Sequence, residues 1–212
     1  MHVHVGPALR RPRRPRLTPL NDEESLRTYA DAYEQASGYR VPDDHLLRST
    51  VLGLFVGHRL VGGGVVSGSL PLRTLERLPA AERARIGARL APCRVVEVTC
   101  VWLAAEIRRS ALSGIFWCAL LRRIHLTGAD DVLFGTEQPG LHRLYLNTRA
   151  DLLYEGQVTV DGHERFGWVF LKRNTSPWPV AARMTLHTAR RRARRSVREP
   201  AMGVAAPVGA GG

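Results

Sequence analysis

VVEVTCVWLAAEIRRSALSGIFW, residues 95–117, is the stretch that decides the fold. Residues 94–104 are rich in β-branched apolar side chains, which favours a strand. From residue 110 to residue 126 the apolar side chains recur at helical spacing, and Gly128 is expected to end this helix. A strand that leads into a helix can bind an anion at the free amides of the helix N-terminus, so this turn is a candidate phosphate site.

The chain before this stretch is predicted to hold a helix, a hairpin and an insertion. Residues 21–39 have one apolar face at helical spacing, acidic residues in the first turn and Gly38 at the end. Residues 49–70 indicate two antiparallel strands joined by a turn near Gly57. Residues 72–92 are charged, helix-prone and interrupted by proline, as expected of an insertion between strands.

The chain after this stretch continues with strands and a short helix. We expect a strand at 131–136, a helix at 139–148 and two strands at 151–162 and 164–173. Helices thus lie between neighbouring strands, while both ends of the order are hairpins. This order predicts an α/β fold in which a mixed central sheet is flanked by helices.

Composition describes an ordinary globular chain with one domain, which we place at residues 17–182. The 212 residues are 44% hydrophobic and 24% charged. No apolar run approaches 18 residues, and the N-terminus lacks the apolar segment of a signal peptide, so no transmembrane segment is expected. The 3 cysteines lack CxxC spacing, which argues against a disulfide framework or a zinc site. We expect a cytoplasmic protein without a bound metal.

The net charge of +12 is concentrated at the two ends of the chain. Residues 1–16 hold five arginines and residues 183–198 hold seven, whereas residues 17–182 are almost neutral, with 19 basic and 18 acidic side chains. Residues 1–16 and 183–212 are therefore predicted to be disordered basic tails. The tails are either solvated ends or a lure for an acidic partner. The neutral body argues against nucleic acid as the domain's own partner.

The order of elements resembles the GNAT acyltransferase superfamily over roughly residues 17–173. The resemblance rests on VLGLFVGHRLVGGGVV (51–66), on the strand and turn of residues 95–114, and on VLFGTEQPG (132–140) followed by LHRLY. The family's turn pattern, Arg/Gln-x-x-Gly-x-Gly/Ala, matches Arg109 and Gly114 at its ends, with Leu112 in place of the middle glycine. The resemblance implies a mostly antiparallel sheet and N-acyl transfer from a thioester to an amine.

The insertion and the stretch EVTCV (97–101) lean towards a subgroup, the acyl-homoserine-lactone synthases and long-chain N-acyl amino acid synthases. Their Glu-x-Ser/Thr-Arg pattern is matched by Glu97 and Thr99, while Cys100 replaces the arginine. The subgroup implies a fatty acyl donor carried by coenzyme A or by an acyl carrier protein, and a small-molecule amine as acceptor. Apolar Trp102, Phe116 and Trp117 suggest room for a chain longer than acetyl. The alternative is a non-catalytic or nucleic-acid-binding protein that uses the arginine-rich tails.

The resemblance also assigns the residues that bind the donor. The strand backbone at Val101 and Leu103 would pair with the pantetheine amides. The turn would bind the donor's phosphates, through helix amides and charge-assisted contacts, at Arg108, Arg109, Ser110, Ser113 and Gly114. The other interpretation of this turn is a capped surface helix with two solvated arginines.

Glu97 is the predicted general base. It lies among apolar Val96 and Val98, where a carboxylate is costly unless it is hydrogen-bonded, paired or used. Partial burial would raise its pKa and suit it to accept a proton from the amine. The structural alternative is an ion pair with an arginine such as Arg94 or Arg143. Glu137, after the next strand, is a second candidate that lines the acceptor pocket or assists as base.

A tyrosine often protonates the leaving thiolate in this family, and two are compatible with its Asn-x-x-Ala-x-x-Leu-Tyr pattern. Residues 138–145 place Tyr145 there, and residues 147–154 place Tyr154 there with a better match of residue types. We favour Tyr145, because the helix that carries it follows the preceding strand directly. Either tyrosine is equally compatible with a core position in which its hydroxyl is bonded.

Overall fold

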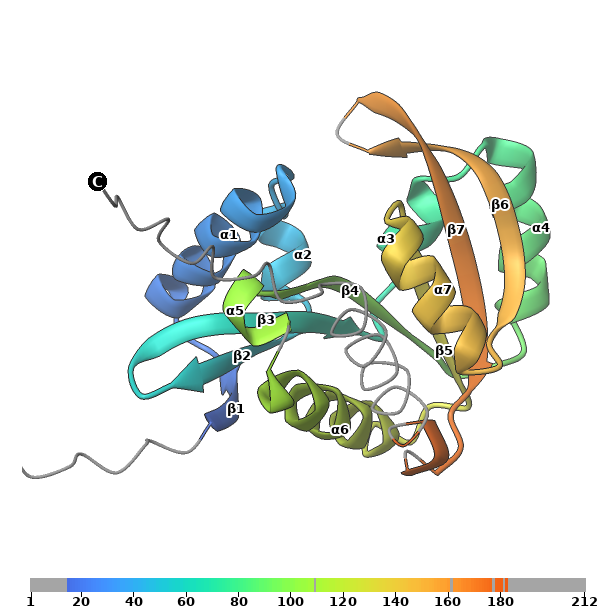
Figure 1. Ribbon diagram of the computed structural model, residues 1–212. Coiled ribbons are helices and arrows are strands. Elements are labelled where there is room, and N and C mark those ends of the chain that lie inside the picture. The colour runs from blue at the N-terminus through green and yellow to red at the C-terminus, as the bar shows by residue number, and fades with distance from the viewer. Residues whose placement is uncertain (1–14, 109, 161, 177, 181, 183–212) are drawn as a thin grey trace, which may run out of the picture.

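A computed structural model describes residues 15–108, 110–160, 162–176, 178–180 and 182. Its centre is a 7-stranded sheet in the order β1-β2-β3-β4-β5-β7-β6 (Figure 1). The strands are β1 (Pro15–Leu20), β2 (Thr50–Val56), β3 (Arg59–Ser67), β4 (Val95–Leu103), β5 (Asp131–Thr136), β6 (Asp151–Val160) and β7 (His163–Arg173). Among the described strands, only the β4–β5 pair is parallel, so the sheet is mixed and mostly antiparallel, as predicted.

Helices cover both faces of the sheet. They are α1 (Glu23–Ser37), α2 (Asp43–Leu47), α3 (Arg73–Glu76), α4 (Ala80–Leu90), α5 (Ala105–Arg108), α6 (Ala111–His125) and α7 (Pro139–Asn147). Successive residues of a strand point to opposite faces of the sheet, so the strand residues that a helix contacts show which face it covers. By this criterion α1, α2 and α4 pack on one face, and α6 and α7 pack on the other.

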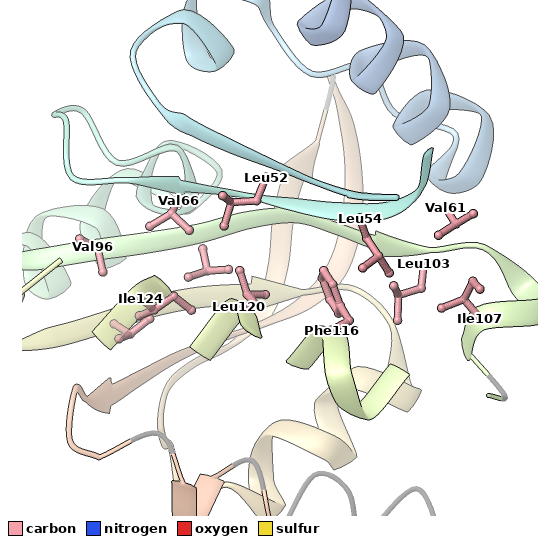
Figure 2. Packing of buried hydrophobic residues seen from close by; sticks show 12 residues of the cluster. Leu52, Leu54, Val61, Val66, Val96, Leu103, Ile107, Phe116, Leu120 and Ile124 are labelled. Atoms are coloured by element: carbon pink, nitrogen blue, oxygen red, sulfur yellow. The ribbon is translucent and has the colours of Figure 1, made fainter. Parts of the chain in front are cut away.

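The largest apolar cluster lies under α6. Figure 2 shows Phe116, Leu120 and Ile124 of this helix pointing toward the strands, where they meet side chains such as Leu52 and Leu54 of β2. Phe116 and Leu120 are almost fully buried. The helical spacing of these residues is the reason that residues 111–125 fold as a helix on this face.

The predicted elements are confirmed to within a few residues. Asp22 caps α1 through its carboxylate, and Gly38 ends it at φ 79°, a left-handed conformation that glycine adopts without strain. The hairpin turns at Gly57, and the insertion contains α3 and α4. In the described part of the chain, no helix combines the length and apolar character needed to cross a membrane.

Three short elements, β1, α2 and α5, are absent from the sequence prediction. Residues 15 and 16 belong to β1, which pairs with β2 at the edge of the sheet, and not to the N-terminal tail. Pro15 and Pro19 argue against a strand when only the sequence is considered, because proline is tolerated in a strand only at the edge of a sheet. The remaining residues of the predicted tails, 1–14 and 183–212, lie outside the described residues.

Candidate active site

The parallel strands β4 and β5 diverge at the middle of the sheet. Residues 95–98 of β4 pair with residues 131–134 of β5, and the last pair is Val98 with Phe134. Beyond it, β4 pairs with β3 and β5 pairs with β7. A gap therefore opens between Thr99 on one side and Gly135 on the other.

A β-bulge in β4 borders this gap. Val65 of β3 pairs with Thr99 and Gly63 pairs with Trp102, so Cys100 and Val101 together oppose one residue. Cys100 has φ 52°, and its carbonyl oxygen accepts a hydrogen bond from the Tyr29 hydroxyl at 2.6 Å. Burial raises the pKa of the Cys100 thiol, which is the opposite of what an activated thiolate requires.

A polar cavity of about 70 Å³ lies at the gap, on the face of the sheet that carries α1 and the insertion. Its polar lining residues come from distant parts of the chain. They are Tyr33 of α1, Thr74 of α3, Arg77 after α3, Thr99 of β4, Glu137 after β5, and Tyr145 of α7. Val101 lines it as well. We call this the polar cavity.

Glu137 and Arg77 form an ion pair inside the polar cavity. The Arg77 Nη1 atom lies 3.1 Å from Glu137 Oε1, and each side chain is 23% exposed. The pair thus keeps contact with solvent, so Glu137 can exchange protons with it. Glu137 is the predicted carboxylate that the structure brings to the cavity.

Tyr145 lines the polar cavity and also a second, apolar cavity on the other face of the sheet. It is 7% exposed, and its ring packs edge-on against Phe134 at 4.6 Å and Phe170 at 5.7 Å between centroids. Burial, and then the charge of Glu137, raise the pKa of Tyr145, so its hydroxyl stays protonated at neutral pH. Tyr154 of β6 lines neither cavity, and its hydroxyl donates to the Gln157 carbonyl at 2.7 Å.

Glu97 lies behind the polar cavity and does not line it. It is fully buried, and its two carboxylate oxygens accept the backbone amides of Arg73 at 3.0 Å and Thr74 at 2.9 Å. Burial raises the pKa of Glu97, and these two hydrogen bonds oppose that rise. The carboxylate therefore anchors the first turn of α3 to β4. Arg94 pairs with Asp130 at 3.3 Å and not with Glu97.

The described residues of the predicted phosphate turn line neither cavity: Arg108 ends α5, and Ser110, Ser113 and Gly114 lie at the start of α6. Ser110 caps α6 by accepting the Leu112 amide at 3.2 Å, Ser113 is buried, and Gly114 is in the first turn. The Arg108 Nε atom donates to the Leu103 carbonyl at 2.6 Å, and the Leu103 side chain belongs to the core under α6. Arg109 lies outside the described residues, and phosphate binding here stays a prediction.

A second, apolar cavity lies across the sheet from the polar one, under α6 and α7. It is also about 70 Å³, and its apolar lining includes Val98, Trp117, Leu120, Leu121, Ile124, Phe134 and Val180. We call this the apolar cavity. Val98 and Tyr145 line both cavities. Of the three aromatic residues that suggest room for an acyl chain, Trp117 lies here, Phe116 is fully buried in the core, and Trp102 packs near Tyr29.

The sequence does not point to Tyr33, Thr74 or Arg77 at this site. Arg77 and Thr74 belong to the insertion, which carries no chemical motif. The sequence marks Glu97 as a carboxylate that needs a partner, but it does not identify the partners, because these are backbone amides. Within the described ranges, no group of three or more His, Cys, Asp and Glu residues is arranged to hold a metal ion.

Neither a protein-family model nor a curated protein matches this sequence. Solved structures do match the fold. The N-acyl amino acid synthase FeeM from uncultured soil microbes has a TM-score of 0.59 at 15% identity, covering 76% of this chain and 91% of that chain.

Two further matches are acetyltransferases. The ribosomal-protein-S18-alanine N-acetyltransferase from Escherichia coli has a TM-score of 0.55 at 7% identity, covering 77% of this chain and 96% of that one. A putative GNAT acetyltransferase from Desulfovibrio desulfuricans has a TM-score of 0.53 at 8% identity, covering 76% of this chain and 100% of that one. Together with the diverging parallel pair β4–β5, these matches show that the chain has the fold of the GNAT acyltransferases.

Proposed function

We propose that the protein is an N-acyltransferase, which moves an acyl group from a thioester donor to an amine in the gap between β4 and β5. The observation that carries this proposal is the pair of cavities on either side of the gap, which share Val98 and Tyr145. A polar cavity suits an amine and the proton transfers that its attack requires. An apolar cavity suits an acyl chain.

The proposed reaction is direct attack. The amine nitrogen forms a bond to the thioester carbonyl carbon, and the carbon–sulfur bond breaks. Glu137 takes the proton that the amine loses, and Tyr145 gives its proton to the leaving thiolate. The two residues then exchange protons with solvent, and the net products are an amide and a free thiol.

Glu137 is preferred to Glu97 as the base because of its access. A base must lie within hydrogen-bond reach of the proton that it removes. Glu137 lines the polar cavity, whereas both oxygens of Glu97 are engaged by backbone amides behind it. Glu97 then supports the site by fixing α3, which carries Thr74 and leads into Arg77.

The proposed donor is a long-chain acyl thioester. Each buried methylene contributes about 0.8 kcal/mol, and the residues of the apolar cavity offer such burial next to Tyr145. Beyond Val98, the edge of β4 that faces the gap has no strand partner among the described residues, so the backbone at Val101 is open to pantetheine amides. The phosphates would lie at the N-terminus of α6 with Arg108 and Arg109. Coenzyme A and an acyl carrier protein both present this pantetheine arm.

The proposed acceptor carries an anionic group beside its amine. Arg77 is the positive group next to Glu137, and a guanidinium binds a carboxylate through two parallel hydrogen bonds. An amino acid offers both an amine for Glu137 and a carboxylate for Arg77. FeeM, which shares the fold, is an N-acyl amino acid synthase, and this likeness supports the same class of product here.

The experiment is a screen of donors and acceptors by mass spectrometry. The full chain is incubated with acyl-CoA and acyl-carrier thioesters from acetyl to palmitoyl, together with amino acids and matched amines that lack the carboxylate. We expect an N-acyl amino acid, formed best from a long-chain donor. No amide product from any pair would contradict the function. A product formed best from acetyl-CoA would contradict the donor, and equal use of amines without a carboxylate would contradict the role of Arg77.

A further inference from the structure

A histidine lies behind the polar cavity and is used by no step above. His45 of α2 is 1% exposed, although α2 is at the surface of the fold. Its Nε2 atom lies 2.9 Å from the Thr99 Oγ1 atom, and its Nδ1 atom lies 4.0 Å from Glu97 Oε1. Since Thr99 lines the polar cavity, a line of polar atoms runs from the cavity through the imidazole to Glu97.

The imidazole is neutral, so its function depends on which nitrogen carries the proton. Burial lowers the pKa of His45 to about 4, and the charges of Arg73 and Arg48 contribute to this lowering, against Asp44. The Nδ1 atom has no hydrogen-bond partner among the described residues, and the Glu97 carboxylate lies on that side, 4.0 Å away. A proton on Nδ1 is attracted to this carboxylate, whereas a lone pair there is repelled.

The favoured tautomer determines what Thr99 offers to the cavity. With the proton on Nδ1, the Nε2 atom is an acceptor, and the Thr99 hydroxyl must donate to it. A threonine hydroxyl has one proton and two acceptor lone pairs. With its proton directed at His45, Thr99 presents only acceptor capacity to the polar cavity.

We propose that His45 is a positioning residue that turns the Thr99 hydroxyl into a hydrogen-bond acceptor for the acceptor amine. This inference rests on the proposed function. A primary amine has two N–H groups at the moment of attack. One points to Glu137 and leaves as the proton, and the other donates to Thr99 Oγ1, so that the nitrogen lone pair faces the thioester in the gap. Glu97 sets the tautomer of His45 and touches no substrate.

The inference also predicts the class of amine. A secondary amine has one N–H, which Glu137 removes, and nothing remains to donate to Thr99. The enzyme should therefore prefer a primary amino acid to its N-methyl counterpart, and this preference should depend on Thr99 and His45.

The first test is spectroscopic and needs no activity. The ¹⁵N chemical shifts of the His45 imidazole are measured in the uniformly labelled full chain at neutral pH, with His45→Gln for assignment. We expect a protonated Nδ1 and an unprotonated Nε2. A proton on Nε2 would overturn the inference, whether or not the protein is an N-acyltransferase.

The second test is kinetic and compares four variants of Thr99 and His45. Thr99→Val keeps the shape but removes the hydroxyl, and His45→Phe removes the acceptor nitrogen. We expect each to raise the KM for the primary amine roughly tenfold, the loss expected for one hydrogen bond, with the donor KM unchanged. Thr99→Ser should restore the KM to within about threefold, and Thr99→Val combined with His45→Phe should be no worse than either alone.

These outcomes separate the inference from the function on which it rests. An active Thr99→Val enzyme with an unchanged amine KM, or with an unchanged preference for primary over N-methyl amino acids, would overturn the role of Thr99. If His45→Phe does not fold, the imidazole shifts and the Thr99 variants decide alone. If the wild-type chain makes no amide, the proposed function fails, and the tautomer result still stands or falls separately.

Discussion

The two cavities at the β4–β5 gap differ in how they are built. The polar cavity draws its lining from α1, the insertion, the strands β4 to β7 and α7, and these positions run from Tyr33 to Val169. The apolar cavity takes four lining side chains from one face of α6, and the others come from Val98 of β4, from β5, from residues 145 and 148, and from residues 172–175 and 180. Both sides of the gap are thus assembled by tertiary contacts, but the apolar side includes a row of four side chains from one amphipathic helix, whereas the polar side combines charged and hydroxyl groups from separate elements.

The two carboxylates near the gap, Glu137 and Glu97, also differ in their environment and in the role that follows from it. Glu137 lies at an open cavity beside Arg77. Glu97, only one strand away, is sealed behind that cavity by the amides of Arg73 and Thr74. A carboxylate that is accessible from the cavity can accept a proton from a substrate, whereas one whose two oxygens both accept backbone hydrogen bonds stabilises the fold.

The largest expected effect is on the open carboxylate. Glu137→Gln keeps the shape but removes the basicity, so kcat should fall by roughly 10² to 10⁴, with donor binding retained. The control is Glu155→Gln, whose side chain is exposed on β6 and lines neither cavity, and it should leave kcat within about twofold. Steady-state kinetics with the best donor and acceptor provide the measurement. Full activity of Glu137→Gln would return the role of base to Glu97.

A pH effect on stability should follow from His45, behind the polar cavity. Its pKa is about 4 in the folded state against about 6.5 unfolded. The unfolded state binds more protons in this window, so the free energy of unfolding falls as the pH is lowered from 6.5 to 4. At about 1.36 kcal/mol per unit, the loss is about 3 kcal/mol.

The measurement is urea unfolding of the wild type and His45→Gln at pH 7 and pH 4.5. Other groups titrate in both proteins, so only the difference in their pH dependence reports on His45. The wild type should lose more stability than the variant. Identical pH dependence would show that His45 is not held neutral by its surroundings.

The sealed carboxylate should give a loss of stability of a similar or smaller size. In Glu97→Gln, one carboxylate oxygen becomes an amide NH₂ that faces a backbone N–H, so one buried amide of α3 loses its acceptor. The expected cost is about 1–3 kcal/mol, or a Tm lower by about 2–4 °C for each kcal/mol. Differential scanning calorimetry measures it. Unchanged Tm with a hundredfold loss of kcat would instead make Glu97 the base.

The smallest expected effect is on chain length, at the apolar cavity. Leu121→Phe fills part of the cavity, so the preferred acyl chain should shorten, with a change of about fourfold in kcat/KM per methylene that loses its burial, equivalent to about 0.8 kcal/mol. Ile115→Phe, on the exposed side of α6, is the matched control. A chain-length profile that is the same in both variants would place the acyl chain elsewhere.

Sequence patterns predict the fold around the gap better than the site itself. Strand β4 and helix α6 carry dense local patterns, and β-branched runs and helical spacing depend on few distant contacts. Tyr145 and Glu137 follow from their place after β5. Arg77 could not be predicted, because it reaches Glu137 across 60 residues of chain. Glu97 stands out in the sequence as a carboxylate that needs a partner, but backbone amides leave no trace in residue types.

The loss of the Tyr145 hydroxyl is the sharpest test of acyl transfer at the gap, since Tyr145 lines both cavities and the proposed reaction needs its proton. The measurement is kcat for acyl transfer in Tyr145→Phe beside Tyr154→Phe, each of which removes one hydroxyl. Tyr154 donates to a backbone carbonyl on β6, away from both cavities. We expect kcat to fall by roughly 10² or more in Tyr145→Phe and to stay within about twofold in Tyr154→Phe. Equal losses in the two variants, or a loss in Tyr154→Phe alone, would contradict this expectation.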